Sequence, residues 1–182
     1  MGAAVVIEDI AERRLRDAEL HRLALHDPLS VRNRARLDDD IERALGARDS
    51  RGGVVAVLYL DVDDFKGVND RHGHVVGDRV LIALSSRLRD AVREEDTVAR
   101  LGGDEFVLVA HLPGASDADE LRARVEEVCA DPVHLGDVTL QVHVSVGMTL
   151  VGTEGGSAAR VLSAADAEMY AVKRGRKRCT VG

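Results

Sequence analysis

Aromatic residues are scarce in this 182-residue chain: they make up 2% of the sequence, and there is no Trp. Proteins that hold single-stranded nucleic acids usually stack the bases on aromatic side chains, so this composition argues against such a platform. The formal net charge is -7, which would also repel a polyanionic duplex. We therefore expect no nucleic-acid partner.

Cysteine is scarce as well. Cys129 and Cys179 have no metal-ligand spacing, and two thiols in a chain of this length do not make a disulfide framework. No apolar run approaches the roughly 18 residues that span a bilayer, and the N-terminus lacks the basic start and cleavage site of a signal peptide. We expect a cytoplasmic protein without direct membrane contact.

Aliphatic residues, by contrast, are abundant. Hydrophobic residues account for 45% of the chain, which is enough to build a core for one domain of ordinary size. Before that domain, the pattern predicts a short strand over residues 3–7 and a charged helix over 8–25. The spacing of the apolar residues in this helix suggests a coiled-coil linker, and an ordinary surface helix is the alternative. We expect residues 1–25 to be a linker region and residues 26–182 to form the folded domain.

Apolar periodicity predicts the elements of that domain. Helices are expected after Asn33 and around residues 80–92, 118–128 and 161–172. Strands are expected over residues 54–60, 97–101 and 106–110, with one long strand over 138–150. This order predicts an α+β fold with helices on one face of a mainly antiparallel sheet.

Three carboxylates are expected to converge. Asp61 ends the buried strand over 54–60, while Asp104 and Glu105 stand in the tight turn of the next hairpin, directly after Gly102 and Gly103. Carboxylates gathered at a strand edge repel one another unless a hard cation neutralises them, and Mg²⁺ suits oxygen ligands beside phosphates. The two glycines would let a ligand approach the backbone closely. The alternative is that these acidic residues merely occupy a turn.

Two long segments resemble the GGDEF family of diguanylate cyclases, which condense two GTP molecules into cyclic di-GMP and pyrophosphate. One is residues 100–106 (RLGGDEF), and the other is residues 60–78 (LDVDDFKGVNDRHGHVVGD). The two signatures stand in the family's order and separation, and the resemblance covers roughly residues 26–178. It implies a palm-like βαββαβ core of the ferredoxin-like or nucleotide-cyclase-like kind. It also implies catalysis by a homodimer, because each domain holds one GTP.

The resemblance further implies a role for each matching residue. Asp61, Glu105 and the carbonyl of Val62 would bind Mg²⁺ or Mn²⁺, and Asp104 would act as the base or as a metal-side carboxylate at the ribose 3′-hydroxyl. The implied phosphate contacts are the backbone amides of Asp63, Asp64 and Phe65 and the side chains of Lys66, of Lys173 and of either Arg176 or Lys177. The implied guanine contacts are Asn69 and Asp78. Gly102 and Gly103 are the implied substrate contacts in the turn.

The two residues implied to contact guanine also have other interpretations. Asp78 could be a helix N-cap before Val80 and Leu81, and Asn69 could be a turn residue. Neither alternative explains both residues at the family's spacing.

Arg93 and Asp96 match the RxxD site through which the family's product, cyclic di-GMP, inhibits the enzyme. Such a run could hold product because an Arg forks onto phosphate or guanine while an Asp accepts guanine donors. The alternative is a solvated charge run after a helix. The resemblance places this run close to the catalytic hairpin and at the end of the preceding helix.

The sequence departs from the family at both ends. Residues 27–34 (DPLSVRNR) are one residue shorter than the family's opening motif and lack its glycine, and residues 174–178 (RGRKR) are irregular. Residues 5–13 resemble the end of a PAS sensor domain that leads into a signalling helix, so we expect an upstream sensory domain. The alternatives to a diguanylate cyclase are a degenerate domain that binds GTP or cyclic di-GMP without turnover, and a dimerising module that binds no nucleotide.

Overall fold

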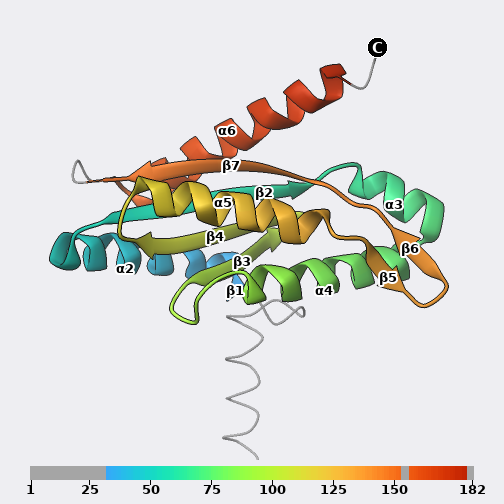
Figure 1. The fold of residues 1–182 in the computed structure, drawn as a ribbon, viewed down its shortest axis with the longest axis horizontal. Coiled ribbons are helices and arrows are strands. Elements are labelled where there is room, and N and C mark those ends of the chain that lie inside the picture. Colours follow the sequence, from blue (N-terminus) through green and yellow to red (C-terminus); the bar gives the residue numbers. More distant parts are fainter. Residues whose placement is uncertain (1–31, 153–155, 180–182) are drawn as a thin grey trace, which may run out of the picture.

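A five-stranded sheet forms the centre of the protein. The computed structural model describes residues 32–152 and 156–179. Within them the strand order is β1-β3-β4-β2-β7, with β1 and β3 parallel and the other pairs antiparallel (Figure 1). The strands are β1 (Arg32–Asn33), β2 (Val54–Val62), β3 (Thr97–Gly102), β4 (Glu105–Leu112) and β7 (Val144–Val151). The α+β fold with a mainly antiparallel sheet is therefore as predicted.

Helices cover both faces of this sheet. They are α2 (Arg34–Arg51), α3 (Phe65–His72), α4 (His74–Asp90), α5 (Ala115–Ala130) and α6 (Ala158–Cys179). Leu58 of β2 belongs to a core cluster with residues of α4 and α5, whereas its neighbour Val57 belongs to a second cluster with residues of α2 and α6. The prediction of helices on one face was wrong. A strand whose residues are buried on both sides needs a layer on each side, and β2 is such a strand.

The predicted long strand over residues 138–150 was also wrong. Instead, β5 (Val133–Leu135) and β6 (Val138–Leu140) form a separate two-stranded hairpin, and β7 begins only at Val144. Gly136 has φ 71° in the two-residue turn of the hairpin, a left-handed conformation that glycine adopts at little steric cost. The break at residues 141–143 matters for the site, because it frees the His143 carbonyl to accept a hydrogen bond from the Asp63 amide at 2.9 Å.

The last helix, α6, lies directly against β7. A side chain at Gly147 would meet the Met169 backbone nitrogen at 2.1 Å and the Ala165 carbonyl oxygen at 2.2 Å. This close approach brings the C-terminal half of α6 beside the end of β2, where Asp61 lies.

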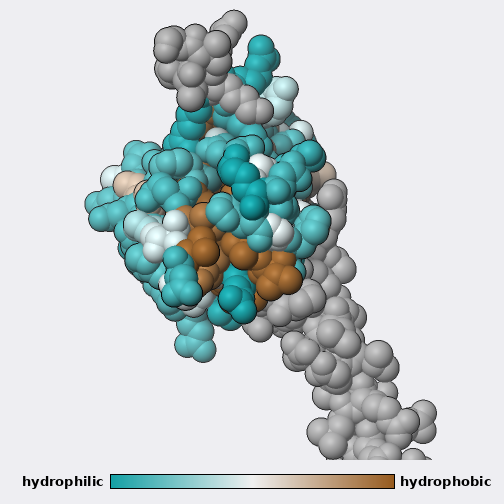
Figure 2. Space-filling model, turned by 90° about the vertical axis from the view of Figure 1, so that its right-hand side faces the viewer, coloured by the Kyte–Doolittle hydropathy of each residue, from teal (hydrophilic) through white to brown (hydrophobic). Residues whose placement is uncertain are grey.

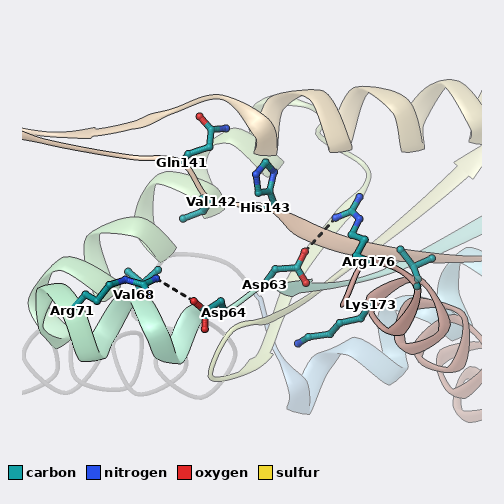
Figure 3. A pocket seen from close by; sticks show the side chains of 11 residues that line it. Asp63, Asp64, Val68, Arg71, Gln141, Val142, His143, Lys173 and Arg176 are labelled. Carbon is teal, nitrogen blue, oxygen red and sulfur yellow. Dashed lines mark hydrogen bonds and ion pairs between the residues drawn. The ribbon is translucent and has the colours of Figure 1, made fainter. Parts of the chain in front are cut away.

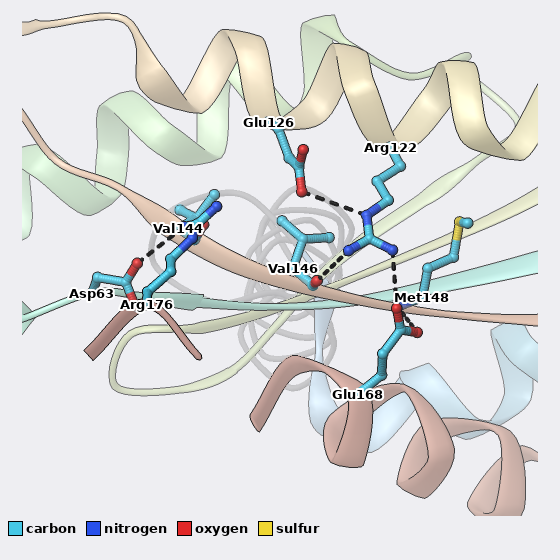
Figure 4. Close-up of polar contacts among 8 residues, drawn as sticks. All are labelled: Asp63, Arg122, Glu126, Val144, Val146, Met148, Glu168 and Arg176. Atoms are coloured by element: carbon cyan, nitrogen blue, oxygen red, sulfur yellow. Dashed lines mark hydrogen bonds and ion pairs between the residues drawn. The ribbon is translucent and has the colours of Figure 1, made fainter. Parts of the chain in front are cut away.

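The outer edge of β7 is covered by side chains rather than by another strand (Figure 4). Arg122 of α5 donates to the Val146 carbonyl at 3.1 Å and pairs with Glu168 of α6 at 2.9 Å. The Met148 amide in turn donates to Glu168 at 2.7 Å. This clasp joins helices from opposite faces of the sheet and occupies backbone groups that would otherwise be open to edge pairing.

The predicted strand over residues 3–7 and helix over 8–25 lie outside the described residues, so the division at residue 25 stays a prediction. Among the helices that the structure does describe, none has the length and apolar character needed to cross a membrane.

Candidate active site

The site is built at the end of the two central strands. Asp61 of β2 is paired directly with Glu105 of β4, and the Val62 amide donates to the Asp104 carbonyl at 3.1 Å. Because β2 ends at Val62 and β4 begins at Glu105, the C-terminal end of β2 and the β3–β4 turn meet at one end of the central strands. The predicted meeting of Asp61 with the acidic hairpin is confirmed at the level of the backbone.

These acids influence one another electrostatically. Burial raises the pKa of Asp61, and the charges of Asp104 and Asp63 raise it further, while Lys173 opposes the rise. Burial also raises the pKa of Glu105, and the charges of Asp61 and Asp104 act in the same direction, against a hydrogen bond from Tyr59. Packing several carboxylates into a half-buried site costs stability, and such an arrangement is typical of functional sites.

Lys173 reaches this site from α6 and forms an ion pair with Asp61. Burial alone would lower the pKa of Lys173, but the hydrogen bond and charge of Asp61 outweigh it, so the pKa is raised. The donor set of Asp61, Glu105 and the Val62 carbonyl consists of hard oxygens, which fits Mg²⁺ or Mn²⁺. In residues 36–152 and 156–176, however, no three His, Cys, Asp or Glu side chains stand close enough to hold a metal ion. The ammonium of Lys173 supplies the positive charge at Asp61 in this arrangement.

After β2 the chain turns into α3 through Asp63 and Asp64. Asp64 has φ 52°, in the left-handed region that non-glycine residues seldom adopt. The two side chains point apart: Asp63 faces Arg176 of α6, and Asp64 faces Arg71 of α3 (Figure 3). The predicted phosphate contact Lys66 is exposed on α3, where it pairs with Asp70 at 3.0 Å.

A pocket of about 830 Å³ adjoins this turn, between α3, residues 141–143 and the end of α6 (Figure 3). Its apolar lining includes Val68, Val142 and Val172. Figure 2 shows hydrophobic side chains gathered in a hollow at the end of the molecule where Figure 1 draws α3 and the β5–β6 hairpin. The volume lies within the range of small-molecule sites, and Lys173 lines the pocket while also contacting Asp61.

The two predicted guanine contacts lie on adjacent helices. Asn69 is inside α3 and Asp78 is inside α4, which begins at His74 after the capping residue Gly73. Both alternative interpretations are therefore wrong, because Asp78 is not an N-cap and Asn69 is not in a turn. A side chain at Gly77 would meet the Asn69 Oδ1 atom at 1.9 Å, so the absence of one lets α4 approach Asn69 closely.

Arg93 and Asp96 lie in the turn after α4, not on the helix itself, which ends at Asp90. The Arg93 amide donates to Asp96 Oδ2 at 2.9 Å, and burial raises the pKa of Asp96. Both residues line a second pocket, of about 270 Å³, together with Arg124 of α5. Asp90, Asp117 and Glu120 line the same cavity, so its two arginines can bind phosphate while its carboxylates can accept hydrogen bonds from guanine.

The GGDEF family model, described as diguanylate cyclase, GGDEF domain, matches residues 24–179. The chain belongs to the GGDEF family. It is 40% identical over 158 residues to the bifunctional diguanylate cyclase/cyclic di-GMP phosphodiesterase MucR of Pseudomonas aeruginosa, covering 85% of this chain and 23% of MucR. It is 39% identical over 168 residues to the diguanylate cyclase TpbB of the same organism, covering 90% of this chain and 39% of TpbB. The GGDEF domain thus spans well under half the length of these two relatives.

A solved structure with similar architecture is the coiled coil and GGDEF domain of DgcB from Caulobacter crescentus in complex with cyclic di-GMP. Its TM-score is 0.80 at 30% identity, and the match covers 94% of each chain. The palm-like GGDEF fold predicted from the sequence is therefore confirmed.

The structure of this GGDEF domain adds residues that sequence reasoning missed. Arg124 joins Arg93 and Asp96 only through the packing of α5, and no local motif indicates this. Of the two candidates for the second phosphate contact, Arg176 is bound to Asp63 and to the Val144 carbonyl, while the Lys177 side chain lies outside the described part of the chain. Gly102 ends β3 and Gly103 stands with Asp104 in the β3–β4 turn, where Arg100 donates to the Gly103 carbonyl at 2.7 Å. Residues 27–31 of the shortened opening motif lie outside the described residues.

Proposed function

We propose that this domain is a diguanylate cyclase that condenses two GTP molecules into cyclic di-GMP and pyrophosphate. The observation that carries the proposal is the direct pairing of Asp61 with Glu105, beside Asp104, at a half-buried edge of the sheet. Half-buried carboxylates that raise one another's pKa are costly for the fold, and a reaction that assembles phosphates and a divalent cation there gives them a use.

The residues suited to hold Mg²⁺ or Mn²⁺ are Asp61, Glu105, Asp104 and the carbonyl of Val62. When bound, the ion would neutralise charge on the phosphates and orient the reacting oxygens. Lys173 would then leave Asp61 for a phosphate oxygen, because both are anionic partners within reach of a flexible ammonium. The ion pair between Lys173 and Asp61 supports this exchange, since it shows that the lysine reaches the site.

The other residues bind and orient the substrate. Asp104 is proposed to accept the proton of the 3′-hydroxyl that attacks the α-phosphate of the second GTP, with pyrophosphate as the leaving group. Asn69 and Asp78 would accept hydrogen bonds from the guanine edge. The proposed phosphate contacts are the amides of Asp63, Asp64 and Phe65 and the side chains of Lys66, Lys173 and Lys177, and Gly102 and Gly103 would let the nucleotide approach the backbone. Positioning and charge neutralisation would supply most of the rate acceleration.

Catalysis by this scheme needs two copies of the domain face to face, because each holds one GTP. We propose that residues 1–25 connect the domain to an upstream sensory domain that controls this encounter. Arg93, Asp96 and Arg124 are proposed to bind cyclic di-GMP as an inhibitor, supported by their shared pocket.

A second candidate function is a domain that binds GTP or cyclic di-GMP without turnover. One observation favours it: in the part of the chain that the structure describes, no three acidic, His or Cys side chains stand close enough to hold a metal ion. Incubation with GTP and Mg²⁺ followed by chromatography separates the two functions, since only the enzyme yields cyclic di-GMP, whereas both bind nucleotide.

A further inference from the structure

Asp63 is held more completely than its neighbours in the turn after β2. Its amide donates to the His143 carbonyl at 2.9 Å. One carboxylate oxygen accepts a hydrogen bond from the Ser145 hydroxyl at 2.8 Å. The other lies 3.2 Å from a guanidinium nitrogen of Arg176, a contact drawn in Figures 3 and 4. Backbone and side chain of one residue are therefore both fixed from outside the turn.

The partners of Asp63 come from two other elements. Ser145 is fully buried on β7, and Arg176 stands on α6, where it also donates to the carbonyl of Val144. The guanidinium thus connects α6, the first residue of β7 and the turn after β2. One guanidinium nitrogen makes both contacts, and a lysine ammonium, which also carries several donors, could replace only part of this role because its charge is not held in a planar group.

The turn needs such support because its backbone is unfavourable. Asp64 adopts φ 52°, a left-handed conformation that costs free energy in a non-glycine residue, although Asp tolerates it better than most. Asp64 itself is exposed, and its own ion pair with Arg71 is on the surface. The Asp64 carbonyl accepts the Val68 amide at 3.1 Å within α3, whereas the contacts of this turn to β7 and α6 come from Asp63, the residue immediately before it.

We propose that Arg176 and Ser145 act on the reaction as positioning residues, by fixing Asp63 and with it the backbone of residues 62–65. The inference rests on the proposed function, in which the Val62 carbonyl and the next three amides contact metal and phosphate. Removing a residue that orients a metal ligand through a hydrogen bond typically lowers metal affinity or activity by about 10-fold to 100-fold. In this scheme Arg176 fixes the backbone amides that contact phosphate and does not contact phosphate itself.

The test compares Arg176→Gln, Arg176→Lys and Ser145→Ala with the wild type. Arg174→Gln is the matched control: it removes the same charge from the same helix, at an exposed residue that stacks over Tyr170. Hydrogen exchange without ligand should show faster exchange of residues 62–66 in Arg176→Gln and Ser145→Ala, and wild-type exchange in Arg174→Gln. In the presence of GTP and Mg²⁺, kcat should fall by about 10-fold to 100-fold in Arg176→Gln, and Arg176→Lys should recover part of the loss.

Unchanged exchange in Arg176→Gln, or an equal change in Arg174→Gln, would overturn the proposal. So would faster exchange with an unaltered kcat, because the turn would then not need to be fixed for the reaction. If the wild type makes no cyclic di-GMP, the proposed function fails by itself, and Mn²⁺ affinity in the presence of GTP, followed by electron paramagnetic resonance, replaces kcat. That affinity should weaken by about 10-fold to 100-fold in Arg176→Gln, and equal affinities would contradict the positioning role.

Discussion

Asp61 and Glu105 face each other across the two central strands of the sheet, at the last paired position before the hairpin turn. Like charges at directly opposed strand positions destabilise a sheet, and burial adds to the cost here. The paired carboxylates therefore lower the free energy of unfolding at the place where the proposed chemistry occurs.

This pair predicts how stability depends on pH. The ordinary pKa values of Asp61 and Glu105, 3.8 and 4.5, are both raised in the fold, so the folded protein binds these protons more tightly than the unfolded chain. Their stabilising contribution is full below the ordinary values and is lost as pH rises through the raised values. Glu105→Gln should flatten this part of the profile and raise the free energy of unfolding at neutral pH. Urea denaturation across a pH series measures the free energy of unfolding of the wild type and of Glu105→Gln. Parallel pH profiles of this free energy for the two proteins would contradict the account.

Asp78 is expected to govern GTP affinity. Asp78→Ala should weaken GTP binding by about 10-fold to 100-fold, because a charged hydrogen bond contributes roughly 1.5 to 3 kcal/mol. Asp119→Ala, an exposed aspartate on α5, is the control and should bind like the wild type. Calorimetric titration gives both affinities, and an unchanged value for Asp78→Ala would remove this residue from the nucleotide site.

Feedback by product should depend on the pocket after α4. Cyclic di-GMP bound at Arg93 and Asp96 could cross-link two domains and keep their GTP sites apart, so inhibition should be noncompetitive with GTP. Arg93→Ala and Arg124→Ala should both relieve it, while Arg160→Ala, an exposed arginine on α6, should not. Initial rates with and without added product decide the matter. Equal inhibition of all four proteins would place the inhibitory site elsewhere.

The clasp over the edge of β7 should contribute measurably to stability. Glu168→Ala removes the acceptor of the Met148 amide and the partner of Arg122, and we expect a loss of about 1 to 3 kcal/mol in the free energy of unfolding. Glu127→Ala, an exposed glutamate on α5, should change stability by less than about 0.5 kcal/mol. Denaturant unfolding compares them, and equal effects would mean that the clasp adds nothing beyond surface charge.

The meeting of Asp61 with the hairpin could be predicted from sequence because it depends on local pattern: a buried strand, a tight glycine turn and the pairing between them. The helix α3 was not foreseen, since its eight residues carry one buried side chain, Val68, and show no apolar repeat. The second helical layer had a signal in the continuous apolar run of β2, which differs from the alternation of a strand exposed on one side.

Contacts between segments distant in the sequence could not be predicted from the sequence. Ser145 and Arg176 meet Asp63 only because the chain breaks before β7 and because Gly147 lets α6 approach that strand. The alternation of apolar residues over 138–150 continues through the break and does not reveal it, and the irregular residues 174–178 left two candidates for one role. Such arrangements depend on packing geometry, which pattern and spacing do not encode.

The central claim is that this domain makes cyclic di-GMP with the carboxylates of Asp61, Asp104 and Glu105. The most direct test incubates the wild type and Glu105→Gln with GTP and Mg²⁺ at several protein concentrations and separates the nucleotides by chromatography. The account predicts cyclic di-GMP from the wild type, with specific activity that rises with protein concentration because two domains must meet, and no product from the folded Glu105→Gln protein. GTP binding by the wild type without any cyclic di-GMP, or product formation by Glu105→Gln at the wild-type rate, would contradict it.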